Sequence, residues 1–249
     1  MKKLFYVVSL FAGLTSFHLL HAQQVFDGIN AQLGLGAATS QVSAGGTDDD
    51  SWYGSSPLNV NGNSSGTRLV GLASIGYSKS FSSYNLAANL FYVIGNQSAG
   101  GSSATGVTSN ITPDGPSKKV SENLNSSYTL KNTLGISLEP GYYFDKDLLA
   151  YLKLAYVTTS LQSNLSCNSS DGYCPNQMSS SSQSLNGFGY GLGVKKMFTD
   201  SIYGAVDLLG VTYGNVNKSY NLSTYSTAPN NASFKTTQYM GFVSVGYKF

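Results

Sequence analysis

The feature that most constrains this chain is a two-residue alternation of apolar and polar side chains, which is clearest at the end of the sequence. Five of the last eleven residues fall on one face of an extended strand: Tyr239, Val243, Val245, Tyr247 and Phe249. After residue 22, no apolar run reaches the length that a membrane-spanning helix needs. The chain contains 28 Gly, 18 Tyr and 12 Phe but only 10% charged residues. This pattern predicts strands that separate lipid from a wetter space.

Residues 1–22 have the features of a secretory signal peptide. Lys2 and Lys3 precede a mostly apolar stretch without acidic residues, and we expect cleavage between Ala22 and Gln23. A single transmembrane anchor is the alternative interpretation. Cleavage removes two of the 14 basic residues and leaves 12 against 12 acidic residues, so the mature domain, 23–249, is close to neutral. A neutral chain does not support nucleic-acid binding.

Eight alternating segments, separated in a regular way, predict the fold. Long and short connections alternate along the chain. The long connections are rich in Ser, Asn, Gly and Thr and span 39–67, 97–126, 163–184 and 216–235. The short connections are 82–83, 145–147 and 199–201. The pattern predicts an all-β fold, an eight-stranded antiparallel up-and-down transmembrane β-barrel with four long extracellular loops and short periplasmic turns. A soluble lipocalin-like barrel is the alternative, but it does not explain this asymmetry. The expected strands are 25–38, 68–81, 84–96, 127–144, 148–162, 185–198, 202–215 and 236–249.

Four charged residues should lie inside such a barrel. With Lys146 at the centre of a hairpin, Glu139 and Lys153 stand opposite one another, about 18 Å from the turn. A lysine facing lipid at that depth costs roughly 2–4 kcal/mol, so both should face the lumen. Asp207 reaches the same depth, with Lys195 one diagonal away. The four form either an ion-pair network that fills the interior and fixes strand register, or a gate across a narrow conducting path.

Glycines on one wall of the lumen predict large side chains on another. Gly187, Gly189, Gly191 and Gly193 occupy four successive lumen-facing positions. They leave room for large interior residues such as Phe91, Tyr151 and Tyr213. A cavity for a hydrophobic ligand is the alternative.

The mature chain lacks histidine, because both histidines, His18 and His21, belong to the predicted signal peptide. Without histidine, the Ser-His or Asp-His chemistry of outer-membrane hydrolases is not available, and the commonest transition-metal ligand is missing. We therefore expect no enzyme activity, no catalytic residue, no metal and no cofactor. The acidic run 48–50 is a candidate Ca²⁺ site, a site for divalent ions that bridge lipopolysaccharide, or a solvated loop.

Two cysteines, Cys167 and Cys174, lie in the third long loop and are the only ones in the chain. An even number of cysteines in an exported protein favours a disulfide, which should shape the loop tip.

Taken together, the signal peptide, the strand and loop layout and the last strand resemble the small outer-membrane β-barrel family. This family includes the opacity proteins, outer-membrane protein X and the membrane domain of outer-membrane protein A. The resemblance implies a Gram-negative outer membrane, contact with its lipid and lipopolysaccharide, and a monomer. It also implies that Val245, Tyr247 and Phe249 are a signal for the barrel-assembly machinery, although the expected Gly is replaced by Ser244.

The resemblance leaves the function open, because the family is functionally varied. Our leading hypothesis is a non-enzymatic surface protein that supports envelope integrity and whose loops contact external partners, with host surface molecules as candidates, in the manner of an adhesin or opacity protein. The length and polarity of the loops motivate it. The alternative is a narrow pore or a transporter of small, including hydrophobic, molecules.

Overall fold

The computed structural model describes residues 25–48, 58–110, 118–169, 178–220 and 230–249. In this part of the chain, ten strands and no helix are found. No described helix is long and apolar enough to cross a membrane. The strands are β1 (Gly28–Asp48), β2 (Leu58–Phe81), β3 (Tyr84–Ile94), β4 (Gln97–Asn110), β5 (Lys118–Asp145), β6 (Leu148–Ser169), β7 (Met178–Met197), β8 (Ile202–Tyr213), β9 (Val216–Tyr220) and β10 (Asn230–Lys248).

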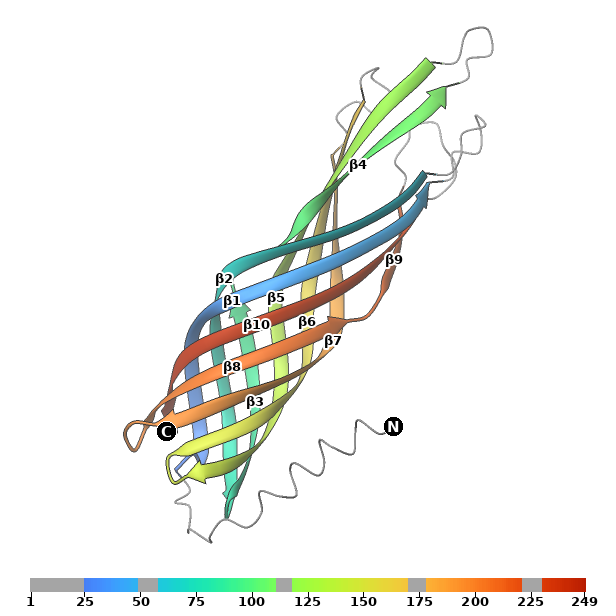
Figure 1. Cartoon of the computed structure of the whole chain (residues 1–249). Coiled ribbons are helices and arrows are strands. Elements are labelled where there is room, and N and C mark those ends of the chain that lie inside the picture. Colours follow the sequence, from blue (N-terminus) through green and yellow to red (C-terminus); the bar gives the residue numbers. More distant parts are fainter. Residues whose placement is uncertain (1–24, 49–57, 111–117, 170–177, 221–229) are drawn as a thin grey trace.

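Eight of these strands close into a ring, which confirms the predicted barrel. The order is β1-β2-β3-β5-β6-β7-β8-β10, and β10 pairs with β1 in antiparallel fashion. This closing ladder is long, running from Asn30 opposite Lys248 to Thr47 opposite Asn231. Figure 1 shows the strands wound obliquely around the barrel, with short turns at one end and long hairpins at the other. β4 and β9 lie on the hairpin side, paired with β5 and β10 respectively.

The strands extend much further than the sequence alternation indicates. β1 continues to Asp48, ten residues past its predicted end, and β5 begins at Lys118. Much of the four predicted loops is therefore paired strand, including the whole of β4 and β9. The alternation fails there because Ser, Asn, Thr and Gly fill both faces, whereas backbone hydrogen bonds to the neighbouring strand maintain the pairing.

The apolar faces that the alternation predicts lie on the outside of the barrel. In β3, every residue from Tyr84 to Ile94 alternates between exposed and buried, with the apolar set on the exposed side. Leu152, Leu154 and Tyr156 are likewise exposed on β6. β8 divides in the same way, since Leu208 is exposed and Leu209 is buried. An apolar exterior around a closed ring is the arrangement of a barrel in lipid, not of a soluble lipocalin-like barrel.

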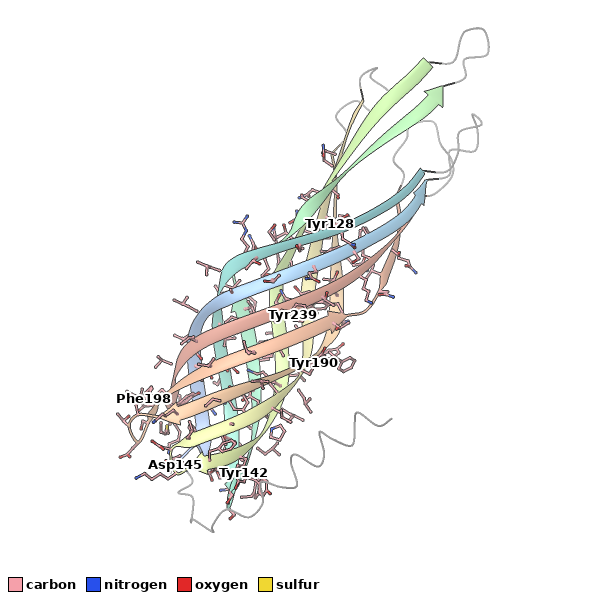
Figure 2. The ribbon with its side chains drawn as sticks, in the orientation of Figure 1. Tyr128, Tyr142, Asp145, Tyr190, Phe198 and Tyr239 are labelled. Carbon is pink, nitrogen blue, oxygen red and sulfur yellow. The ribbon has the colours of Figure 1, made fainter. Side chains whose placement is uncertain are left out.

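Aromatic residues mark two levels on this exterior. Three exposed aromatic pairs, on or directly after a strand, lie eight residues apart, which corresponds to about 20 Å along the barrel axis at a tilt near 40°. The pairs are Tyr84 and Tyr92, Tyr190 and Phe198, and Tyr239 and Tyr247. Figure 2 shows Tyr142 and Phe198 near the turn end, and Tyr190 and Tyr239 further up. We call the two levels the lower and upper girdles. The protein is an outer-membrane barrel, with its turns towards the periplasm and its hairpins outside.

This arrangement predicts a depth-dependent effect of charge on the outer face. Leu154 lies about 15 Å from the turn at Leu148, well inside the apolar belt, and its side chain is exposed to lipid. We expect Leu154→Arg to lower the free energy of unfolding by about 2–4 kcal/mol. Urea unfolding in lipid vesicles measures this change. Phe144→Arg, outward-facing beside the turn, is the matched control and should cost at most about 1 kcal/mol. Equal effects of the two would contradict the assigned membrane position.

Candidate functional site in the barrel interior

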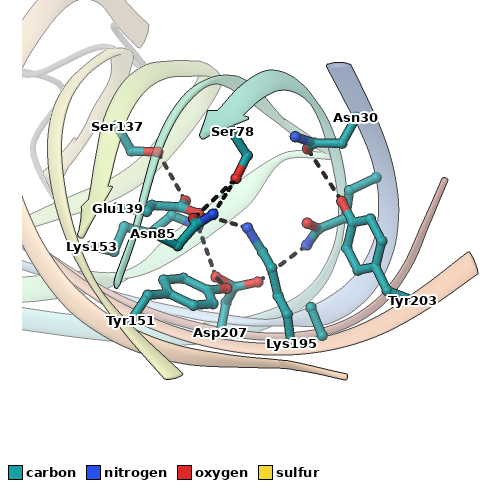
Figure 3. A network of polar contacts seen from close by, with 12 residues as sticks. Asn30, Ser78, Asn85, Ser137, Glu139, Tyr151, Lys153, Lys195, Tyr203 and Asp207 are labelled. Atoms are coloured by element: carbon teal, nitrogen blue, oxygen red, sulfur yellow. Dashed lines mark hydrogen bonds and ion pairs between the residues drawn. The ribbon is translucent and has the colours of Figure 1, made fainter. Parts of the chain in front are cut away.

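The middle of the lumen contains a cluster of four charged side chains from four consecutive strands of the ring. Glu139 of β5, Lys153 of β6, Lys195 of β7 and Asp207 of β8 are all buried. Figure 3 shows the four converging across the interior. The structure thus brings together all four residues that the sequence placed inside the barrel. We call them the ionic cluster.

Strand register explains why these residues meet. Leu138 pairs with Leu154 and Gly141 with Tyr151, so the same register places Glu139 opposite Lys153. Two interfaces further round the ring, between β7 and β8, Gly193 is opposite Asp207. Because side chains alternate along each strand, these positions share the lumen face and the same depth.

The ionic cluster is a chain of alternating charges. Lys195 Nζ lies 2.8 Å from Glu139 Oε2, and Glu139 Oε1 lies 3.1 Å from Lys153 Nζ. Lys153 Nζ lies 2.8 Å from Asp207 Oδ1. Lys195 therefore pairs with Glu139 two strands away, instead of with Asp207, its diagonal neighbour. Two carboxylates and two ammonium groups leave the cluster without net charge, which is the condition under which buried charges are tolerated.

Neutral groups complete the coordination of the two carboxylates. Asp207 accepts hydrogen bonds from Tyr151 Oη at 2.6 Å and from Gln32 Nε2 at 3.2 Å, in addition to Lys153. Glu139 accepts one from Ser137 Oγ at 3.1 Å. The ammonium of Lys195 also lies 4.5 Å from the centre of the Tyr151 ring, a cation–π contact. These contacts connect β5, β6, β7 and β8, together with Gln32 of β1, through one continuous group of side chains.

Glycines provide the space for the large interior aromatics, as predicted. A Cβ atom on Gly193 would collide with the Tyr151 ring, and one on Gly187 would lie 2.8 Å from Cδ1 of Tyr213. Phe91 is also buried, but the glycine that faces its ring is Gly135 of the adjacent strand β5. The packing interpretation is confirmed at these positions. The predicted glycine wall does not line an open cavity there.

A second aromatic group closes the periplasmic end, and sequence reasoning missed it. Phe26, which precedes β1, is 4% exposed and packs against Tyr143 and Tyr203, with ring centroids 6.1 and 5.7 Å away. The next residue, Asp27, accepts hydrogen bonds of 2.6 Å from Lys79 Nζ and from the backbone N–H of Ser80. Burial opposes ionisation of Asp27, but these bonds outweigh it and lower the pKa of its carboxyl. Residues 25–27 therefore form a plug at the periplasmic end of the lumen.

A third interior group, which is polar and which the sequence analysis also missed, lies towards the hairpin end. Gln238 of β10 donates to the Gln97 side-chain oxygen and to Ser40 Oγ, and accepts a bond of 2.9 Å from Tyr213 Oη. Gln97 also bonds Thr133, and both glutamines are fully buried. We call this group the amide tier. An apolar core that includes Phe91, Leu209 and Phe242 lies in the same part of the barrel.

The remaining predicted sites lie at the ends of the chain or outside the described residues. Val245, Tyr247 and Phe249 are exposed on the outer face at the end of β10, and their recognition by the assembly machinery stays a prediction. Ala22, Gln23 and Cys174 fall outside the described residues, and for Cys167 only the backbone in β6 is described, so the cleavage site and the disulfide also stay predictions. Among the described residues, no group of three or more His, Cys, Asp or Glu could hold a metal ion.

Comparison with solved structures finds outer-membrane barrels. OprG from Pseudomonas aeruginosa is 13% identical with a TM-score of 0.47, covering 90% of this chain and 97% of its own. The attachment invasion locus protein Ail of Yersinia pestis is 12% identical, with a TM-score of 0.37 and coverages of 90% and 99%. The outer membrane protease OmpT from Escherichia coli is 12% identical, with a TM-score of 0.44 and coverages of 91% and 98%. The likeness is one of barrel architecture. No protein-family model and no curated protein matches the chain.

The ionic cluster generates a prediction about stability. Glu139→Gln leaves Lys195 buried without a carboxylate, so we expect the free energy of unfolding to fall by about 3–5 kcal/mol. The double variant Glu139→Gln with Lys195→Met removes both charges of that pair and keeps Lys153 with Asp207. It should recover most of the loss. Urea unfolding of refolded protein, followed by heat-modifiable gel migration, measures both. A double variant no more stable than the single one would show that the cluster is not held by charge pairing.

Proposed function

We propose that this outer-membrane surface protein is non-enzymatic and acts outside the cell, through long polar hairpins that contact external partners as an adhesin does. The observation that carries the proposal is the continuation of paired strands far beyond the upper girdle. β5 and β6 stay paired up to Glu122 opposite Ser169, thirteen residues past Tyr156 of the apolar belt. This corresponds to about 40 Å of strand. Barrel closure within the membrane does not need this length.

Beyond the upper girdle, the described parts of β6 and β7 contain no charged residue and offer a hydrogen-bonding surface. On β6 and β7, Ser160 Oγ lies 3.0 Å from Ser182 Oγ, and Gln162 Nε2 donates to Ser180 Oγ. Such cross-strand pairs stiffen the hairpin, and a stiff surface loses less conformational entropy on binding. Rows of hydroxyl and amide groups favour partners that are themselves rich in hydroxyls or amides.

The filled interior supports binding of external partners over transport of solutes through the lumen. From the periplasm outwards, the lumen holds the Phe26 plug and the ionic cluster, with the amide tier towards the hairpin end. An eight-stranded barrel has an interior that side chains just fill. A narrow pore or a transporter of small molecules is the rival function, and it needs these groups to move.

Hairpin trimming tests the proposal. Joining Ser103 to Asn125 through Asn-Gly keeps the cross-strand pair of these residues and removes the β4–β5 tip, and joining Gln162 to Ser182 does the same for β6–β7. We expect at least a tenfold loss of binding to host cells or extracellular matrix, with normal heat-modifiable migration. Lys146→Gln, in a periplasmic turn, is the control and should bind as the wild type does. If the trimmed barrels bind equally well, the adhesin proposal fails.

Conductance recordings in planar bilayers distinguish a pore from a surface-binding protein. We expect the purified wild-type barrel to give no discrete conductance steps, because the three interior groups fill the lumen. Discrete steps whose size changes in Lys153→Met would favour a conducting path through the ionic cluster. Such a result would favour transport through the barrel over the adhesin proposal.

A further inference from the structure

A cavity of about 440 Å³ lies on the hairpin side of the barrel, apart from the interior groups described above. It is formed by β1, β2, β10 and the start of β9 together with the residue before it. Its lining is polar and rich in small residues: Ser43, Ala44, Gly45, Gly62, Asn63, Asn215, Asn217, Ser233, Phe234 and Lys235. We call it the outer groove.

Strand alternation places most of the lining of the outer groove on the face that points away from the lumen, while Ala44, Gly62 and Phe234 belong to the alternate row. Val42 and Phe234 are buried in the apolar core, whereas the alternate residues Ser43 and Lys235 are exposed. Asn63, Ser43 and Lys235 form one row across β2, β1 and β10, since Ser43 is paired with both of the others. Side chains in one row project from the same face of a sheet. The groove is therefore open to the surroundings of the barrel.

A second row lies further up the same face. Ser233 is paired with Gly45 on one side and with Asn217 of β9 on the other. The glycine and the serines are small, and they leave the space that the longer side chains of Asn63, Asn217 and Lys235 border. The groove is thus built from three strands of the ring together with β9, which the sequence did not predict.

The height of the groove places it among lipid headgroups. Lys235 is four residues above Tyr239 of the upper girdle on the same strand, which is about 10 Å along the barrel axis. Aromatic girdles mark the boundary between acyl chains and headgroups. An outward-facing side chain about 10 Å beyond that boundary meets the sugars and phosphates of the outer leaflet.

The chemistry of the groove fits a phosphorylated sugar. Lys235 supplies a positive charge, and among the described residues no acidic side chain lines the groove. A lysine ammonium binds phosphate as a point charge. The amides of Asn63, Asn215 and Asn217 and the hydroxyl of Ser43 can donate to and accept from sugar hydroxyls. The hydroxyl of Ser233 donates to the Gly45 carbonyl and can accept from a sugar hydroxyl.

We propose that the outer groove binds the phosphorylated glucosamine headgroup of the outer-leaflet glycolipid, with Lys235 on a phosphate. This site is separate from the hairpin tips and does not depend on the adhesin proposal. It gives the barrel a fixed lipid neighbour on the β1–β10 side.

Calorimetric titration of the folded, detergent-solubilised barrel with bisphosphorylated lipid A tests the proposal. We expect Lys235→Glu to weaken binding at least tenfold and Asn217→Ala to weaken it about three- to tenfold, each with unchanged heat-modifiable migration. Lys196→Glu is the matched control, since Lys196 is an exposed lysine at the periplasmic end of β7, and it should bind as the wild type does. Lipid A without phosphates should bind to the wild type as weakly as bisphosphorylated lipid A binds to Lys235→Glu.

Three results would overturn the proposal. Unchanged affinity in Lys235→Glu would remove the groove as the site. An equal loss in Lys196→Glu would show that general surface charge is responsible. Competition by soluble glucosamine 6-phosphate at the affinity of lipid A itself would assign the groove to a free sugar phosphate in place of the lipid.

Discussion

The structure depends on the satisfaction of backbone hydrogen bonds in a medium that offers none. In hydrocarbon, each unpaired N–H or C=O costs several kcal/mol, so a sheet is stable only if its two edges meet. The ladder between β1 and β10 meets this requirement, from Asn30 opposite Lys248 to Thr47 opposite Asn231. Once the ring is closed, every strand must turn one face to lipid and the other to a narrow lumen. The apolar belt, the girdles and the interior charges are consequences of that division.

The lumen solves a second problem, which is how to fill a narrow polar space without leaving charge unpaired. Glu139 and Asp207 are matched by Lys153 and Lys195, and Tyr151 adds a hydrogen bond to Asp207 and a ring beneath Lys195. Gly193 supplies the space for that tyrosine ring. The ion pairs and the glycine that accommodates Tyr151 therefore lie on the same wall of the barrel. A larger residue at Gly193 would displace Tyr151 and with it the hydrogen bond to Asp207.

The sequence alone predicted what depends on alternation and register. The lipid face of β3 and the position of Glu139 opposite Lys153 required only counting from a turn. The pairing of Lys195 with Glu139 was not predicted, because a contact across the lumen depends on how strongly the sheet is curved. Sheet curvature leaves no periodic pattern in the sequence. The amide tier and the outer groove were missed because Gln97 and Lys235 were assigned to loops. Serine- and asparagine-rich strands lack the apolar periodicity by which a strand is recognised.

The seat of Phe26 has a consequence for the order of assembly. Its ring lies between Tyr143 of β5 and Tyr203 of β8, two strands that are made long after it and that are brought together only by the finished ring. Phe26, which comes before the first strand in the sequence, is thus the last of these residues to become buried. Its position depends on completion of the barrel, so protection of residues 25–27 from a protease would report that the ring has closed.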